Sequence, residues 1–266
     1  MAAVSGAHAQ ELLADGDFEG QDLPWVVSAV PGSNVTLFSQ NSPFDYPYPI
    51  GSSSLELVDD DSEDEFPSLR QHFSGPAATI LLSFDFKAPL SANNSSWSIA
   101  WESQDGVPAF FFAVGGQDGS SLELNDQVKI AALAANKWYH LQAYAEVARH
   151  LVEGFVVGEN GQRADFHGGF STNTASQLNS VYISDGTPQR NEILLLDNLV
   201  SRRFLVDSMI DALGEQVLNW LGSTNVVLQS TPVLTSNTQW STIPTTDNKF
   251  TNTLSGSAQF FRLFHP

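Results

Sequence analysis

The sequence predicts an all-β protein, a sandwich of two antiparallel sheets, and three observations support this fold class. Helical periodicity is almost absent from the 266 residues, whereas apolar and polar residues alternate in many short runs. Clusters of Gly, Ser, Asn and Asp separate these runs about every ten residues, as turns do between short strands. Two short acidic motifs, at residues 15–20 and 194–199, flank the alternating region. Because each motif places carboxylates beside strand-forming residues, the two suggest a jelly-roll domain whose first and last strands meet.

Each expected strand follows from its own alternation of side chains. Trp97 and Trp101 lie on one face of the strand expected at residues 97–101, so we expect both rings in the core. The long strand that begins at Trp138 leads into the next strand through an expected hairpin. The strands of this domain are expected at residues 80–86, 97–101, 109–114, 138–147, 151–157, 181–183 and 193–200.

One helix is expected, over residues 206–213, ending at Gly214. We place a domain boundary there. The jelly-roll β-sandwich then covers residues 11–200, followed by a linker at residues 201–214. Residues 215–266 form a second, small β-sandwich module that is short for an independent core. Its strands are expected at residues 217–221, 226–229, 240–243 and 260–264.

The charge balance excludes several classes of partner. Acids outnumber bases 30 to 11, which gives a net charge of −19, although charged residues make up only 15% of the chain. Such an excess of negative charge repels nucleic acid and anionic membranes, and it favours cations or neutral glycans. The chain has no cysteine, so disulfides and thiolate metal sites are excluded. No window holds the roughly 18 apolar residues that a membrane span requires.

Residues 1–10 have the features of a signal-peptide remnant, because Ala7-His8-Ala9 matches an A-x-A cleavage pattern. A flexible terminus is the alternative interpretation. We expect a secreted or cell-surface protein.

Residues 11–200 resemble the jelly-roll, concanavalin-like domains of secreted bacterial proteins, a group that includes many carbohydrate-binding modules. The resemblance implies a structural calcium ion held by Glu19 and Asp197, with Asp17 or a backbone carbonyl as a further ligand. The C-terminal segment resembles a small module that ends many secreted bacterial enzymes and surface proteins. The first resemblance rests on residues 12–19, 42–44, 48–51, 69–73, 82–86, 137–141 and 196–199, and the second on residues 218–220, 228–231, 240–244 and 260–263.

Candidate ligand-binding residues come from one strand and one loop. In residues 138–147, one face is apolar and the other combines aromatic and polar groups, as a sugar-binding surface does. A core role for Trp138 remains an alternative, as does loop packing for the two tyrosines of the Pro-rich loop. The candidates are Trp138, His140, Gln142, Tyr144 and Glu146 on the strand, with Tyr46 and Tyr48 in the loop.

Three functions remain open. The first is noncatalytic binding of a polysaccharide or cell-surface glycan by a secreted, calcium-stabilised sandwich. The second is a polysaccharide lyase or glycoside hydrolase on the same fold, for which no catalytic residue can be assigned. The third is a self-assembling structural or adhesive surface protein. The acidic run at residues 59–65 leaves open a second cation site, although dense like charges usually form solvated loops.

Overall fold

The computed structural model confirms an all-β architecture in which the described residues contain no helix. It describes residues 11–20, 24–28, 33–45, 50–59, 67–88, 96–116, 120–185, 192–203, 207–210, 216–219, 227–233, 235, 238–244, 249–252 and 259–264. The chain divides into two compact units, one spanning Glu11–Ser201 and the other containing Arg202–Pro266. The candidates Tyr46 and Tyr48, the signal-peptide remnant and all of the acidic run except Asp59 lie outside the described residues.

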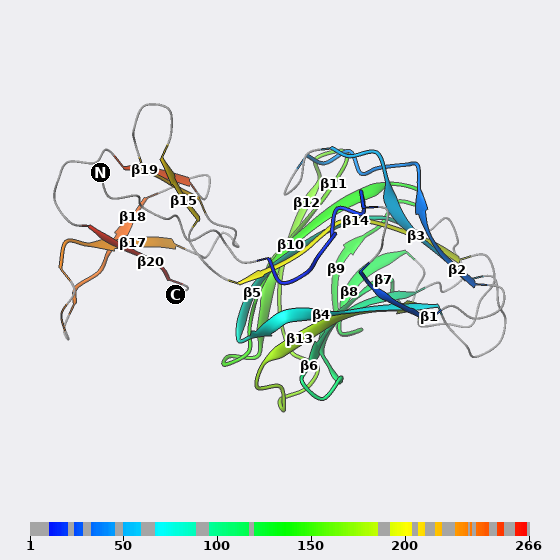
Figure 1. Cartoon of the computed structure of the whole chain (residues 1–266), viewed down its shortest axis with the longest axis horizontal. Coiled ribbons are helices and arrows are strands. Elements are labelled where there is room, and N and C mark those ends of the chain that lie inside the picture. The colour runs from blue at the N-terminus through cyan, green and yellow to red at the C-terminus, as the bar shows by residue number, and fades with distance from the viewer. Residues whose placement is uncertain are drawn as a thin grey trace. The chain divides into compact units, whose positions relative to one another are not determined.

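The first unit is a jelly-roll β-sandwich of two seven-stranded antiparallel sheets (Figure 1). We call them sheet A and sheet B. Sheet A has the order β12 (Arg163–Gly169), β11 (Leu151–Gly158), β10 (Trp138–Glu146), β5 (Thr79–Lys87), β14 (Glu192–Arg203), β3 (Ser54–Asp59) and β2 (Ser33–Phe38). Sheet B has the order β1 (Val26–Ser28), β4 (Ser68–Ala77), β13 (Leu178–Asp185), β6 (Trp97–Ser103), β7 (Pro108–Gly115), β8 (Ser121–Leu124) and β9 (Val128–Ala132).

The core lies between the two sheets and follows the predicted alternation. Trp97 and Trp101 are fully buried, as predicted, and the ring of Trp101 stacks on Phe110 at 5.4 Å between centroids. From sheet A, Phe84 packs against both Trp101 and Phe112. Aromatic pairs of this kind add to the free energy gained from burying their area.

The two acidic motifs meet, as the sequence predicts. The backbone N–H of Leu12 donates to the carbonyl of Ser201 at 2.7 Å, and that of Leu199 donates to the carbonyl of Gly16 at 2.7 Å. A Cβ atom at residue 16 would lie 1.8 Å from the Leu199 carbonyl oxygen, so only glycine permits this approach. The opening segment is therefore bonded directly to the last strand of the sandwich.

The second unit contains two three-stranded antiparallel sheets, and the helix expected over residues 206–213 is wrong where it is described. Residues 207–210 form a strand that pairs with residues 216–219. Pairing with a neighbouring strand therefore overrides the local helical signal. The sheets have the orders β15 (Asp207–Ile210), β16 (Gln216–Asn219), β19 (Lys249–Asn252), and β18 (Ser241–Ile243), β17 (Val227–Thr231), β20 (Phe260–Phe264).

Candidate functional site

The polar side chains predicted on β10 share one face of sheet A, opposite the core. Leu141, Ala143 and Ala145 are fully buried on the inner face. On the outer face the exposed fractions are only 4% for Trp138, 6% for His140, 7% for Gln142 and 4% for Tyr144, whereas Glu146 is half-buried. The parity of this strand is confirmed, but these side chains offer little area on which a sugar ring could stack.

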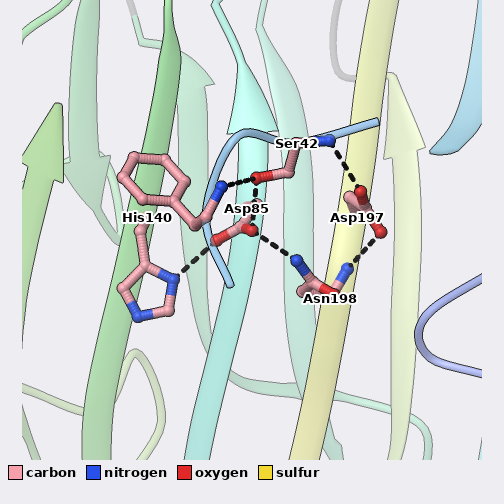
Figure 2. A network of polar contacts seen from close by, with 6 residues as sticks. Ser42, Asp85, His140, Asp197 and Asn198 are labelled. Carbon is pink, nitrogen blue, oxygen red and sulfur yellow. Dashed lines mark hydrogen bonds and ion pairs between the residues drawn. The ribbon is translucent and has the colours of Figure 1, made fainter. Parts of the chain in front are cut away.

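Asp85 of β5 is the centre of a buried hydrogen-bond network on this outer face (Figure 2). Its carboxylate accepts the Ser42 hydroxyl at 2.6 Å and the Asn198 side-chain amide at 2.7 Å. The Nδ1 atom of His140 lies 2.6 Å from the other carboxylate oxygen, which assigns the Nδ1 proton to this contact. A buried carboxylate requires such partners, because an unpaired one would carry a large desolvation cost.

Asp197 belongs to the same network. Its carboxylate accepts the backbone N–H groups of Ser42 and Asn198, each at 2.8 Å. Burial raises the pKa of Asp197 to about 7 in spite of these two bonds, and the charges of Asp85 and Glu19 add to the rise. The network therefore concentrates negative charge in a poorly solvated place.

A β-bulge in β14 places Asp197 and Asn198 together. Leu196 is in the core, and so is Leu199, so two residues in succession point away from it. Asn198 has a φ angle of 49°, in the left-handed region that asparagine tolerates better than most residues. The extra residue shifts the side-chain parity of the strand and turns both polar groups toward Ser42 and Asp85.

This network contains the residue types of a hydrolase triad, but they are connected in a different order. In a triad the histidine accepts the proton of the serine. Here the Ser42 hydroxyl and the His140 ring both donate to Asp85. Tyr144 lies four residues along β10 from His140, about 13 Å away, which is too far to form an acid–base pair with it. The arrangement supports a structural role that joins β5, β10, β14 and the segment at Ser42.

Of the predicted metal ligands, Asp197 belongs to the network around Asp85, whereas Glu19 is bonded to residues 52 and 53. The Glu19 carboxylate accepts the backbone N–H groups of Ser52 and Ser53 and the Ser52 hydroxyl, at 2.7 to 2.8 Å. Although desolvation acts in the other direction, these bonds lower the pKa of Glu19. Desolvation by burial is the main cause that raises the pKa of Asp15, and the neighbouring Asp17 raises the pKa of Asp15 further. No group of three or more His, Cys, Asp or Glu side chains that could hold a metal occurs in the described part of the chain.

A second surface, on the outer face of sheet B, has two aromatic rings that are half-buried. The strand registers place Arg70, Tyr182, Ala100 and Phe111 side by side across β4, β13, β6 and β7. Arg70, Tyr182 and Phe111 are half-buried, and the small Ala100 lies between the two rings. We call these four residues the sheet B row. Its two rings stand two strand spacings apart, about 10 Å.

A buried carboxylate fixes the cationic end of the sheet B row. Glu102 is 2% exposed and accepts Arg70 Nε at 2.9 Å and Arg70 Nη2 at 2.8 Å, a bidentate pair. The Ser180 hydroxyl also donates to Glu102, at 2.8 Å. The Arg70 guanidinium lies 4.5 Å from the centroid of the Tyr182 ring, within cation–π distance. Both the ring and the guanidinium are therefore held in place by contacts within the domain.

The sequence contained part of the signal for this surface. In residues 69–73 and 181–183 the alternation already places Arg70 and Tyr182 away from the core. The outward orientation of Phe111 could not be predicted, because it lies among three consecutive phenylalanines and their sequence does not indicate which of them faces outward. The pairing of Arg70 with Glu102 joins positions 32 residues apart and depends on strand order.

The fold is shared with known structures at low sequence identity. No protein-family model matches the chain, and no curated protein matches it. A sialidase is similar with a TM-score of 0.51 and 10% identity over 68% of this chain, which spans only 18% of the sialidase. A family 11 carbohydrate-binding module from Clostridium thermocellum has a TM-score of 0.38 and 14% identity, covering 73% of this chain and 94% of the module. Peanut lectin has a TM-score of 0.41 and 9% identity, covering 68% of this chain and 97% of the lectin.

Proposed function

We propose that residues 11–201 are a secreted, noncatalytic carbohydrate-binding domain and that the ligand lies along the sheet B row. The observation that carries this proposal is the pair of half-buried rings, Tyr182 and Phe111, beside the fixed Arg70–Glu102 pair. Aromatic faces stack on the apolar faces of pyranose rings, while guanidinium and hydroxyl groups bond the sugar hydroxyls. The sandwich is also similar in fold to a part, 18% of the chain, of a protein named as a sialidase.

The charges favour a neutral glycan. Arg70 is the cation of the row, and its charge is paired with Glu102. The whole chain carries a net charge of −19, which repels polyanions such as polyuronates. The separation of about 10 Å between the rings is of the order of two sugar residues in an extended β-linked chain. We therefore favour a neutral, extended polysaccharide.

The positions of the acids support binding without hydrolysis. A glycosidase needs two carboxyl groups roughly 5–10 Å apart, on either side of the bond that it cleaves. Glu102 is bonded to Arg70 and Ser180. Glu123 of β8 also points outward, but the registers place it two strands and four residues from Glu102, roughly 16 Å away.

Retention of the full chain on insoluble polysaccharides tests the proposal. We expect retention on at least one neutral polymer among cellulose, β-1,3-glucan, xylan, mannan and chitin, and none on alginate or pectate. Reducing ends and absorbance near 235 nm, measured in the same tubes, detect hydrolase or lyase activity. Absence of retention on every neutral polymer would contradict the binding proposal, and release of new chain ends would replace it with the enzymatic one.

We also propose that a calcium ion stabilises this domain at Glu19 and Asp197, with Asp17 or a backbone carbonyl as a further ligand. The donors fit a hard cation, because they are all oxygen atoms and each carboxylate has lone pairs beyond its present bonds. Glu19 and Asp197 also affect each other electrostatically, and burial raises the pKa of Asp197. When bound, calcium would neutralise this negative charge and strengthen the contact between the opening segment and β14.

Thermal unfolding with and without EDTA tests the calcium proposal. Saturation of a site at about 100 times its Kd adds about 2.7 kcal/mol, or roughly 5–10 °C in Tm for a domain of this size. We expect EDTA to lower Tm by that amount and excess calcium to restore it. Glu19→Gln and Asp197→Asn should abolish the response, whereas Asp165→Asn, at an exposed acid on β12, should keep it. A Tm that does not change on chelation would refute the assignment.

A further inference from the structure

The sandwich has two lateral sides, each formed by one edge strand of sheet A and one edge strand of sheet B, and these two sides differ. On one side the edge strands β12 and β9 contact each other, and a Cβ atom at Gly168 of β12 would lie only 2.6 Å from the Leu124 side chain. On the other side, β1 ends sheet B and β2 ends sheet A. Each of these two strands has a partner on only one side among the described strands. We call this side, formed by β1 and β2, the open side (Figure 1).

Core-facing side chains are exposed on the open side. Val27 pairs in register with the core residue Leu69, and Leu37 pairs with the core residue Leu55. Leu69 and Leu55 are fully buried, yet Val27 is 42% exposed and Leu37 is 37% exposed. On the outer faces of the same strands, Val26 and Phe38 are 68% and 38% exposed. The apolar interior of the sandwich thus reaches the surface along this side.

The open side also lacks the charges that normally protect an edge strand. Proteins prevent edge-to-edge pairing with charged residues, proline or bulges in the edge strand. The closed side has such charges, with Arg163 and Asp165 on β12 and Lys129 on β9. β1 and β2 together contain nine residues, and none of them is ionisable or proline. In a chain with a net charge of −19, these two strands therefore present no charge of their own to a second copy.

We propose that two copies of this chain associate through their open sides, with β2 of one copy pairing antiparallel to β2 of the other. β2 is the better strand for this pairing, because it has six residues and β1 has three. A two-fold axis near the middle of β2 would place no like charges opposite each other, and sheet A would continue from one copy into the next. Leu37 and Phe38 would be covered in the process. This inference is independent of the glycan-binding proposal.

Sedimentation velocity of the full chain over a wide concentration range, in about 0.15 M salt to screen the net charge, tests the pairing. We expect a dimer whose association weakens about tenfold or more when Asn34→Lys and Thr36→Lys place like charges across the axis. The control Gln127→Lys with Ala135→Lys adds the same charge at exposed positions elsewhere and should leave the dimer unchanged. A wild-type chain that stays monomeric, or an edge variant that dimerises as the wild type does, would overturn the proposal.

Disulfide cross-linking gives a second measurement that does not depend on the lysine variants folding. Because the chain contains no cysteine, a single introduced thiol can only cross-link to another copy. We expect Thr36→Cys, near the middle of β2, to form a covalent dimer rapidly under mild oxidation. Gln127→Cys, in an exposed turn, should remain monomeric on the same timescale. Equal cross-linking rates at the two positions would show that β2 does not face its copy.

Discussion

Replacing Tyr182 and Phe111 together with alanine is expected to abolish retention of the protein on its polysaccharide. These are the two half-buried rings of the sheet B row, and they stand on β13 and β7 with only Ala100 between them. Aromatic residues at the centre of a binding surface typically contribute about 2 kcal/mol each, which is roughly 30-fold in Kd. The double substitution should therefore weaken binding by at least about 100-fold. Isothermal titration with a soluble oligosaccharide of the retained polymer measures the change.

The matched control is Phe155→Ala, which removes a half-buried ring from the outer face of sheet A. This ring packs under the Arg163 guanidinium at 3.8 Å and lies on the opposite side of the sandwich from the sheet B row. We expect its Kd to stay within about twofold of the wild-type value. If Phe155→Ala loses binding while the double variant keeps it, the ligand lies on sheet A, along the face of β10.

Replacing Asp85 with alanine is expected to lower the free energy of unfolding by about 3–5 kcal/mol. Asp85 is fully buried and is the acceptor shared by Ser42, Asn198 and His140. Its removal leaves three buried donors without their acceptor and leaves a cavity beside β5. Urea denaturation at pH 7, in the presence of EDTA so that calcium does not contribute, measures the loss.

Asp165→Ala is the control for this prediction. Asp165 carries the same charge, but it is exposed and pairs with Arg163 at the surface. Surface ion pairs contribute about 0–1 kcal/mol, so we expect a change below about 1 kcal/mol. A loss at Asp85 no larger than that at Asp165 would mean that the network does not stabilise the sandwich.

Seven of the fourteen described strands of the sandwich were predicted, because their signals are local, whereas β1, β2, β3, β4, β8, β9 and β12 were not. The alternation over residues 138–147 placed Leu141, Ala143 and Ala145 in the core before the neighbours of that strand were known. The helix expected over residues 206–213 shows the limit of local signals. A short apolar segment of this kind suits a helix or a strand, and pairing of residues 207–210 with residues 216–219 decided between them.

Sequence by itself determined the all-β class and the core parity, because these depend on residues close together in the chain. The meeting of the two acidic motifs was predicted from the jelly-roll fold that they suggested, in which the first and last strands are neighbours. Tertiary structure alone decided what each motif contacts. The bulge at Asn198 turned Asp197 and Asn198 toward Ser42 and Asp85, and strand order joined Arg70 to Glu102. These contacts link residues 32 to 155 positions apart. No local pattern encodes them, because sheet order and register are set by how the whole domain packs.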